Sequence, residues 1–181
     1  MSSYYYLMAQ LPGILQNAAA PLPYEQFREI SSRFLSAYDM QILASLSLEP
    51  PKAVIETGSS VVDNWYDWER SLRFSLKKLR AAKLKREFSA AEEMAGSSGF
   101  NTAQIASAAS GLDNPLEAEL FLNKARTDAV GQFATNHYFD SDAVFAYGIM
   151  LLLHERRDQF TAEAGRASYT SIYNQILGEY A

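Results

Sequence analysis

Residues 63–87, DNWYDWERSLRFSLKKLRAAKLKRE, indicate the fold class of this chain most clearly. Apolar side chains recur in this segment at steps of three and four residues, at Trp65, Trp68, Leu72, Leu76 and Leu79. This period lines one face of an α-helix, and neither Gly nor Pro interrupts it. The segment therefore predicts one amphipathic helix, the longest of the chain, with its tryptophans and leucines in the core.

The same segment is strongly basic, although the chain as a whole carries a net charge of −5. Eight of the sixteen Lys and Arg residues lie within positions 69–87. They outnumber the carboxylates of the helix itself, which is typical of a surface that meets an anionic partner. Four of them step along a second face of the predicted helix and are predicted to bind a partner: Arg73, Lys77, Arg80 and Lys83.

Two other interpretations of this cationic face stay open. It is a solvated surface if pairs four residues apart, such as Glu69 with Arg73, satisfy it. It is an internal contact if it pairs with acids elsewhere in the chain, such as Glu92, Glu93 or Glu119. Charge reversal on the face distinguishes a partner contact from an internal one, because only the internal contact would unfold the chain.

Length and composition bound the class of protein. The 181 residues suit one domain or two small ones that share a core, and with 48% hydrophobic residues they can build one. The absence of cysteine excludes disulfides, thiolate metal sites and cysteine nucleophiles, and suits a reducing compartment. The N-terminus lacks a signal-peptide pattern, and the longest apolar run, residues 145–153, is shorter than the ~20 residues that span a bilayer. We therefore expect a cytoplasmic protein.

Helical periods recur through the rest of the chain, so we predict an all-α helical bundle. Asn114-Pro115 and Asp140 or Ser141 are typical helix starts, and Gly165 is a typical helix end. Residues 3–9 are rich in Tyr and are expected to form a short strand or an extended leader. The other predicted helices are residues 24–35, a helix from Asp39 to Pro50, residues 102–109, and a last amphipathic helix through Tyr169, Ile172, Tyr173, Ile176 and Leu177.

Two local details follow from the same patterns. Ser60, with Asp63 three residues further on, resembles a capping box and is expected to introduce the basic helix. The helix after Pro115 is expected to bury one face, formed by Leu116, Leu120, Ala125, Ala129 and Phe133.

The chain divides near its middle at Gly96-Ser97-Ser98-Gly99, which is typical of a flexible connector. We predict a first helical unit over residues 1–95 and a second over residues 100–181, joined in one compact body. The pattern Pro-Leu-x-x-Glu-x-Phe occurs at residues 21–27 and again at residues 115–121, which indicates that the two units are related.

Catalytic patterns are absent from the sequence. Neither His137 nor His154 has a second histidine at metal-binding spacing, and there is no Gly-x-Ser-x-Gly and no phosphate-binding loop. We therefore predict a protein that is not an enzyme, with no catalytic residue, metal or cofactor and no small-molecule substrate.

The triplet Tyr4-Tyr5-Tyr6 is a second candidate partner-binding site. Tyrosines can stack on nucleic-acid bases, but they serve equally as amphipathic anchors in a core or an interface. Because a net acidic chain is a poor general binder of phosphate backbones, a core or interface role explains the triplet as well as or better than base stacking.

Several short motifs resemble a known family, and they occur in the right order along essentially the whole chain. They are Tyr4-Tyr5-Tyr6-Leu7-Met8-Ala9-x-Leu11-Pro12, Trp68-Glu69-x-x-Leu72-Arg73, Leu79-Arg80-Ala81, Pro115-Leu116-Glu117-x-Glu119-x-x-Leu122, Tyr138-Phe139-Asp140, Tyr147, and Phe160-x-x-x-x-Gly165-x-x-x-Tyr169. They resemble a bacterial family of unknown function that is encoded in V-type ATPase operons. That family is itself similar to a shortened form of the V-type ATPase C subunit (the d subunit of eukaryotes), an all-helical funnel of repeated units.

The resemblance implies a non-catalytic central-stalk connector between the rotor shaft and the membrane ring, which supports ATP-coupled proton or sodium transport. Its partners would be central-stalk and membrane-ring subunits, and the chain would lie peripherally on the inner membrane through them. The C subunit has three repeats, whereas this chain has room for two. Two alternatives are a helical adaptor or regulator that binds an acidic protein, and a nucleic-acid-binding helical module, which the net acidic charge disfavours.

Overall fold

The computed structural model describes residues 4–16, 18–85, 101–160 and 162–179. Within these ranges the chain forms eight helices and no strand, which confirms the all-α prediction. The helices are α1 Tyr5–Gln10, α2 Tyr24–Ser31, α3 Ala37–Ser45, α4 Ser60–Lys83, α6 Thr102–Ser110, α7 Pro115–Phe133, α8 Ser141–Asp158 and α9 Ala162–Glu179.

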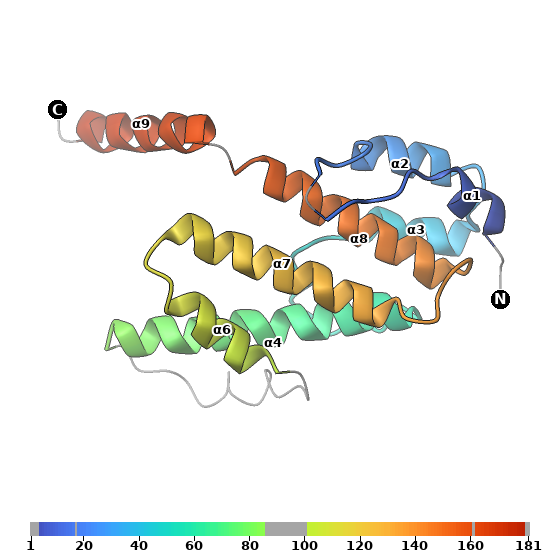
Figure 1. The fold of residues 1–181 in the computed structure, drawn as a ribbon, viewed down its shortest axis with the longest axis horizontal. Helices are drawn as coiled ribbons and strands as arrows, with labels where there is room; N and C mark the ends of the chain where they lie inside the picture. The colour runs from blue at the N-terminus through green and yellow to red at the C-terminus, as the bar shows by residue number, and fades with distance from the viewer. Residues whose placement is uncertain (1–3, 17, 86–100, 161, 180–181) are drawn as a thin grey trace.

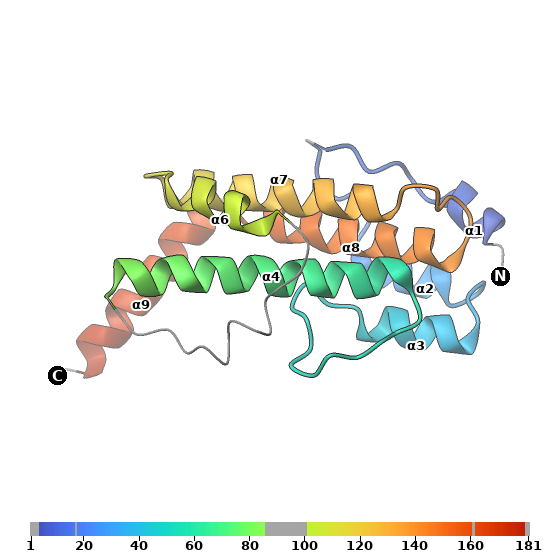
Figure 2. The ribbon, with the colours of Figure 1, turned by 90° about the horizontal axis from the view of Figure 1, so that it is seen from below.

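Three long helices, α4, α7 and α8, form the frame of a helical bundle (Figures 1 and 2). Helix α6 packs on α4 and α7, while α2 and α3 pack on α8. Helix α9 leaves the end of α8 and leads away from the bundle (Figures 1 and 2). No helix in the described part of the chain is long and apolar enough to cross a membrane.

Helix α4 confirms the long amphipathic helix that the sequence predicts. Its apolar face lies in the core, where Trp65, Trp68, Leu72 and Leu76 are buried and Leu79 is half-buried. Its boundaries differ slightly from the prediction. The N-cap is Ser59 rather than Ser60, because the Ser59 hydroxyl accepts the hydrogen bond from the backbone N–H of Val62 at 3.2 Å.

The Tyr-rich N-terminus is helical, so the prediction of a strand or an extended leader was wrong. Helix α1 follows directly after Tyr4, whose backbone N–H donates to the carbonyl of Phe139 at 2.6 Å and whose hydroxyl donates to Asp39. Leu7 is fully buried in this helix. Tertiary contacts thus hold a six-residue helix that would not be stable alone in water.

Helix α7 buries only part of the predicted face: Ala125 and Phe133 are partly buried against the core, as predicted. Leu116 and Leu120 are exposed and Ala129 is buried. The helix is turned because it buries two polar residues, Asn123 and Arg126, beside Leu122 and Val130. Apolar periodicity cannot reveal a face of this kind, because Arg126 enters the core only with a partner from another helix.

The C-terminal part of the chain forms two helices, as the sequence predicted, but the predicted boundary between them at Gly165 was wrong. Asp140 caps α8, as expected, by accepting the Ala143 backbone N–H at 2.9 Å. Helix α8 ends at Asp158, and Gly165 lies inside α9. The connector Gly96-Ser97-Ser98-Gly99 lies outside the described residues.

Candidate interaction surfaces

Arg73, the first of the predicted partner-binding cations, is held by two carboxylates of its own chain. Its Nε donates to Glu69 Oε1 at 2.8 Å and its Nη1 to Glu49 Oε1 at 3.1 Å. The side chain is nevertheless close to half exposed. The two carboxylates therefore fix the position of the Arg73 guanidinium, while part of this charged side chain stays accessible to solvent.

Glu69 is the centre of a buried charge cluster between α4 and α7. Its side chain is fully buried, and Arg126 binds it in a bidentate manner, with Nε to Oε2 at 2.9 Å and Nη2 to Oε1 at 3.1 Å. A buried carboxylate needs such charge-assisted partners, because desolvation of an unpaired charge costs several kcal/mol. The pair therefore fixes how α7 lies against the basic helix.

A second arginine pair lies near this cluster. Arg156 Nη2 donates to Glu119 Oε2 at 2.9 Å, so Glu119 is engaged by α8 rather than by the cationic face of α4. Burial, together with the nearby charge of Arg126, lowers the pKa of the Arg156 guanidinium. The two other acids proposed as internal partners, Glu92 and Glu93, lie outside the described residues.

The remaining predicted cations lie on the exposed C-terminal half of α4. Lys77, Arg80 and Lys83 are all exposed. Lys83 Nζ donates to the carbonyl of Ser110 at 2.7 Å, which links this end of α4 to the end of α6. The sequence from residue 70 to residue 85 contains seven Lys and Arg and no acid, so this end of the helix is strongly cationic. We call the surface formed by Arg73, Lys77, Arg80 and Lys83 the cationic end.

The Tyr triplet divides between core and surface. Tyr4 is buried, whereas Tyr5 and Tyr6 are exposed. The Tyr5 ring contacts Phe139 with ring centroids 4.8 Å apart and contacts Tyr6 at 5.8 Å. Tyr138, next to Phe139, is also exposed. We call the surface formed by Tyr5, Tyr6, Tyr138 and Phe139 the aromatic end.

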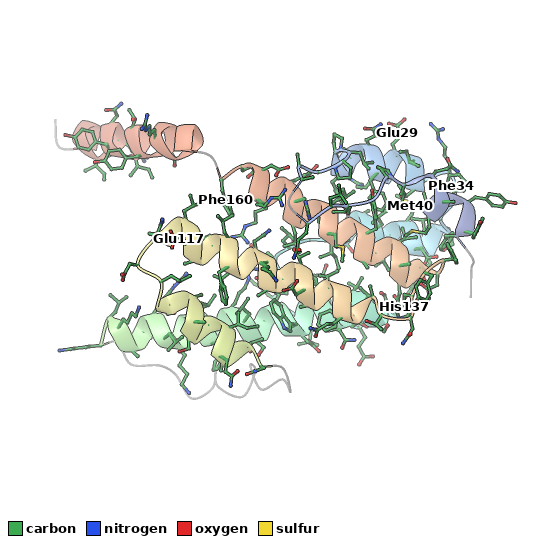
Figure 3. The ribbon with its side chains drawn as sticks, in the orientation of Figure 1. Glu29, Phe34, Met40, Glu117, His137 and Phe160 are labelled. Atoms are coloured by element: carbon green, nitrogen blue, oxygen red, sulfur yellow. The ribbon has the colours of Figure 1, made fainter. Side chains whose placement is uncertain are left out.

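His137 lies next to the start of α8, at the aromatic end of the molecule (Figure 3). Its Nδ1 lies 2.7 Å from Asp140 Oδ2 and its Nε2 lies 3.7 Å from Asp142 Oδ2. The hydroxyls of Ser59 and Ser60 donate to the same Asp142 carboxylate. Both imidazole nitrogens thus face carboxylates, and the two hydroxyls face a carboxylate instead of the imidazole. This geometry ties the start of α4 to the start of α8.

His154, the other histidine, is buried near the opposite end of α8. Its Nδ1 lies 3.2 Å from the carbonyl of Ala18. Asp158 fastens the same loop by accepting the Ala20 backbone N–H at 2.9 Å. Slight burial would raise the pKa of the Asp158 carboxyl, but this hydrogen bond and the adjacent Arg157 outweigh it and lower that pKa. These contacts attach the N-terminal loop to α8.

Two hollows flank α7 and differ in their lining. One, of about 460 Å³, is lined mainly by apolar side chains such as Trp68, Ile105 and Phe121, with Lys124 and Asp128 at its wall. The other, of about 380 Å³, is lined by Leu120 together with polar and basic side chains: Gln16, Asn123, Lys124, Thr127, His154 and Arg157. Across the residues that the structure describes, no three His, Asp or Glu side chains are grouped to hold a metal ion.

The structure does not bring the predicted site residues together. The cationic end belongs to the C-terminal half of α4, whereas α1 lies beyond the other end of that helix (Figures 1 and 2). Sequence reasoning missed Tyr138 and Phe139 as surface groups. The sequence does show an aromatic pair, Tyr138-Phe139, between two predicted helices. It does not show that Phe139 contacts Tyr5, because that contact joins segments distant in the sequence.

Comparisons with protein-family models, with curated proteins and with solved structures found no match to this chain.

Proposed function

We propose that this protein is a non-catalytic helical connector that binds a different partner at each end. One observation carries the proposal: an aromatic surface and a cationic surface lie at opposite ends of a bundle framed by α4 (Figure 1). A helix of 24 residues is about 36 Å long, enough to separate two binding partners. Exposed Tyr and Phe residues are typical interface anchors, while clustered cations steer an acidic partner toward its site.

The assembly that we propose is a bacterial V-type ATPase, in which the chain acts as a connector, similar to the C subunit, between rotor shaft and membrane ring. The motif order in the sequence supports this choice, and an all-helical body with two unlike ends suits it. The chain would then support proton or sodium transport without carrying out chemistry, and would reach the membrane surface only through its protein partners.

The same proposal includes a chain built from two related helical units, with α4 and α8 as equivalent helices. At an offset of 79 residues, the pattern Trp68, Leu72, Lys77 and Lys78 in α4 corresponds to Tyr147, Leu151, Arg156 and Arg157 in α8. Leu72 and Leu151 are both fully buried. The Pro-Leu segments agree less well, because Phe27 is buried while its counterpart Phe121 is exposed. The relation is therefore best supported for the long helices.

Purification of the intact ATPase from its native membrane tests the proposal. We expect the chain to co-purify at a fixed ratio and to appear by electron microscopy between shaft and ring. Co-purification at a position outside the rotor would favour the alternative, a helical adaptor or regulator. No association with the ATPase, together with salt-dependent binding to DNA, would favour the nucleic-acid module instead.

Activity assays test the non-catalytic part of the proposal. We expect the purified chain to show no ATPase, phosphatase or esterase turnover, because His137 and its serine neighbours are held by carboxylates. Turnover that disappears in a His137→Ala or a His154→Ala variant would contradict this part.

A further inference from the structure

Helix α9 exposes an apolar stripe that the rest of the described chain does not cover. Tyr169, Ile172, Tyr173 and Ile176 follow the helical period and are each 49% to 70% exposed. Among the described helices, none of the closely packed pairs includes α9, and this helix leads away from the bundle (Figures 1 and 2). A helix of 18 residues gains most of its stability in water from packing of such a face.

A second uncovered apolar stripe lies on the first half of α7. Leu116, Leu120 and Phe121 are 38% to 46% exposed, although the sequence pattern predicts burial of the two leucines. The chain therefore carries two separate apolar surfaces, one on a projecting helix and one on the bundle.

The α7 stripe is flanked by charges of both signs, because Lys124 lies beside Leu120 and Phe121. Asp113 and Glu117 lie exposed next to the α7 stripe. Arg166 is the one charged side chain described in α9, and it lies exposed one turn before Tyr169.

We propose that two copies of this chain form a dimer in which α9 of each copy docks on the α7 stripe of the other. The α9 stripe begins seven residues beyond Ala162, roughly 10 Å along the helix. From there α9 leads away from its own bundle, so the α7 stripe of a second copy is the surface it can meet without reversing its direction.

The buried area favours this reciprocal arrangement over pairing of the two α9 helices. With ~200 Å² for a fully exposed side chain, the α9 stripe offers roughly 450 Å² and the α7 stripe roughly 250 Å². Pairing α9 with α9 would bury roughly 900 Å² in total, below the ~1,200 Å² of a specific interface, whereas two reciprocal dockings bury roughly 1,400 Å². A closed twofold dimer also satisfies both stripes of both chains.

The oligomeric state of the full chain tests the proposal, which does not depend on the proposed ATPase function. Light scattering and analytical ultracentrifugation over a range of concentrations should show a dimer. Ile172→Asp in α9 and Leu120→Asp in α7 should each weaken dimerisation at least tenfold. Ser171→Asp, which places the same charge on the opposite face of α9, should leave the dimer intact. Unchanged circular dichroism and melting temperature would show that the variants fold.

Mixing and crosslinking separate the possible geometries. A mixture of the Ile172→Asp and Leu120→Asp chains should form a mixed dimer, because one docking site stays intact. Because the chain has no cysteine, a Leu120→Cys/Ile172→Cys variant treated with a short bismaleimide should yield covalent dimers.

Three results would overturn the proposal. A monomer at all concentrations would exclude the dimer. Loss of the dimer with the α9 variant alone would indicate pairing of α9 with α9. A crosslink within one chain would show that α9 folds back on its own α7.

Discussion

Glu69 is a residue whose role in the fold is not apparent from its place in the sequence. In the sequence it is an ordinary acid, four residues before Arg73 on an amphipathic helix. In the fold its carboxylate is fully buried and receives both Arg73 and Arg126. Arg126 Nη1 has no hydrogen-bond partner among the described residues. Glu69 is the carboxylate that pairs with this buried guanidinium and compensates its charge.

Breaking this pair should be strongly destabilising. Glu69→Gln leaves the buried Arg126 guanidinium uncompensated, and we expect a loss of about 3–5 kcal/mol in the free energy of unfolding, measured by urea denaturation. The control is Glu25→Gln, which removes an exposed partner of Arg28 and should cost less than about 1 kcal/mol. Equal effects of the two variants would show that the buried pair contributes no more than an exposed one.

Leu72 tests the predicted core face of α4. It is fully buried, so Leu72→Ala should reduce the free energy of unfolding by about 2–5 kcal/mol through lost burial and a residual cavity. Leu84→Ala, at an exposed position after the same helix, should change it by less than about 0.5 kcal/mol. A loss below half a kcal/mol at Leu72 would contradict the assignment of the buried face.

Tyr147 should make stability fall at alkaline pH. Burial raises its pKa to about 12, and its hydroxyl donates to the Pro12 carbonyl at 2.8 Å. An unfolded phenol ionises near pH 10, so the contribution of Tyr147 is fully present below pH 10 and is lost between pH 10 and about 12. Unfolding by urea at pH 9 to 12 should show a shallower decline in Tyr147→Phe. The same decline in both proteins would mean that the phenol does not couple to folding.

Two glycines show how neighbouring elements decide the role of one residue type. Gly148, in α8, lies where α2 and α3 approach closely: a Cβ there would meet Phe27 at 3.1 Å, Leu46 at 3.2 Å and Leu43 at 3.3 Å. Gly131, in α7, is exposed, and the nearest atom to its Cβ would be Met150 at 3.9 Å. The first glycine permits close helix packing, while the second only lowers helix propensity.

Alanine at these two positions should have opposite effects on thermal stability. Gly131→Ala should stabilise the chain by about 0.5–1 kcal/mol through helix propensity. Gly148→Ala gains the same propensity, but it crowds three packed side chains and should be destabilising by about 1–3 kcal/mol net. Calorimetry of both variants measures the difference. Stabilisation by Gly148→Ala would show that α2 and α3 can move away from α8 without cost.

In the molecule as a whole, the two ends should be separable by mutation. Lys77→Glu combined with Arg80→Glu should weaken binding of purified ATPase subunits, and the effect should shrink as salt rises. The melting temperature should stay nearly unchanged, because exposed charges on a helix contribute only tenths of a kcal/mol to folding. Pull-down and calorimetry measure the two quantities.

Lys52→Glu is the matched control for this charge reversal, because Lys52 is an exposed lysine that precedes α4. It should leave binding unchanged. Unfolding of the double variant would indicate that the cationic end pairs within its own chain. Unchanged stability and binding would place the contact elsewhere, with the aromatic end as the next surface to test.

Local sequence patterns were sufficient to predict the helical class, the long basic helix and its buried tryptophans and leucines. They also located Asn114 and Asp140 as helix caps. These features depend on contacts within a few residues: helical periodicity, the orphan N–H groups of a first turn, and the absence of Gly and Pro from α4. Each of these features can therefore be predicted from one short segment of the sequence.

Contacts between distant segments determine which face α7 buries and where the exposed aromatics gather. Arg126 lies in the core because Glu69, 57 residues earlier, neutralises it there. Tyr4 is buried and Tyr5 exposed because the chain between α7 and α8 returns to the N-terminus, where Phe139 accepts the Tyr4 N–H. Both outcomes rest on partners distant in sequence, and a local hydrophobic period carries no information about such partners.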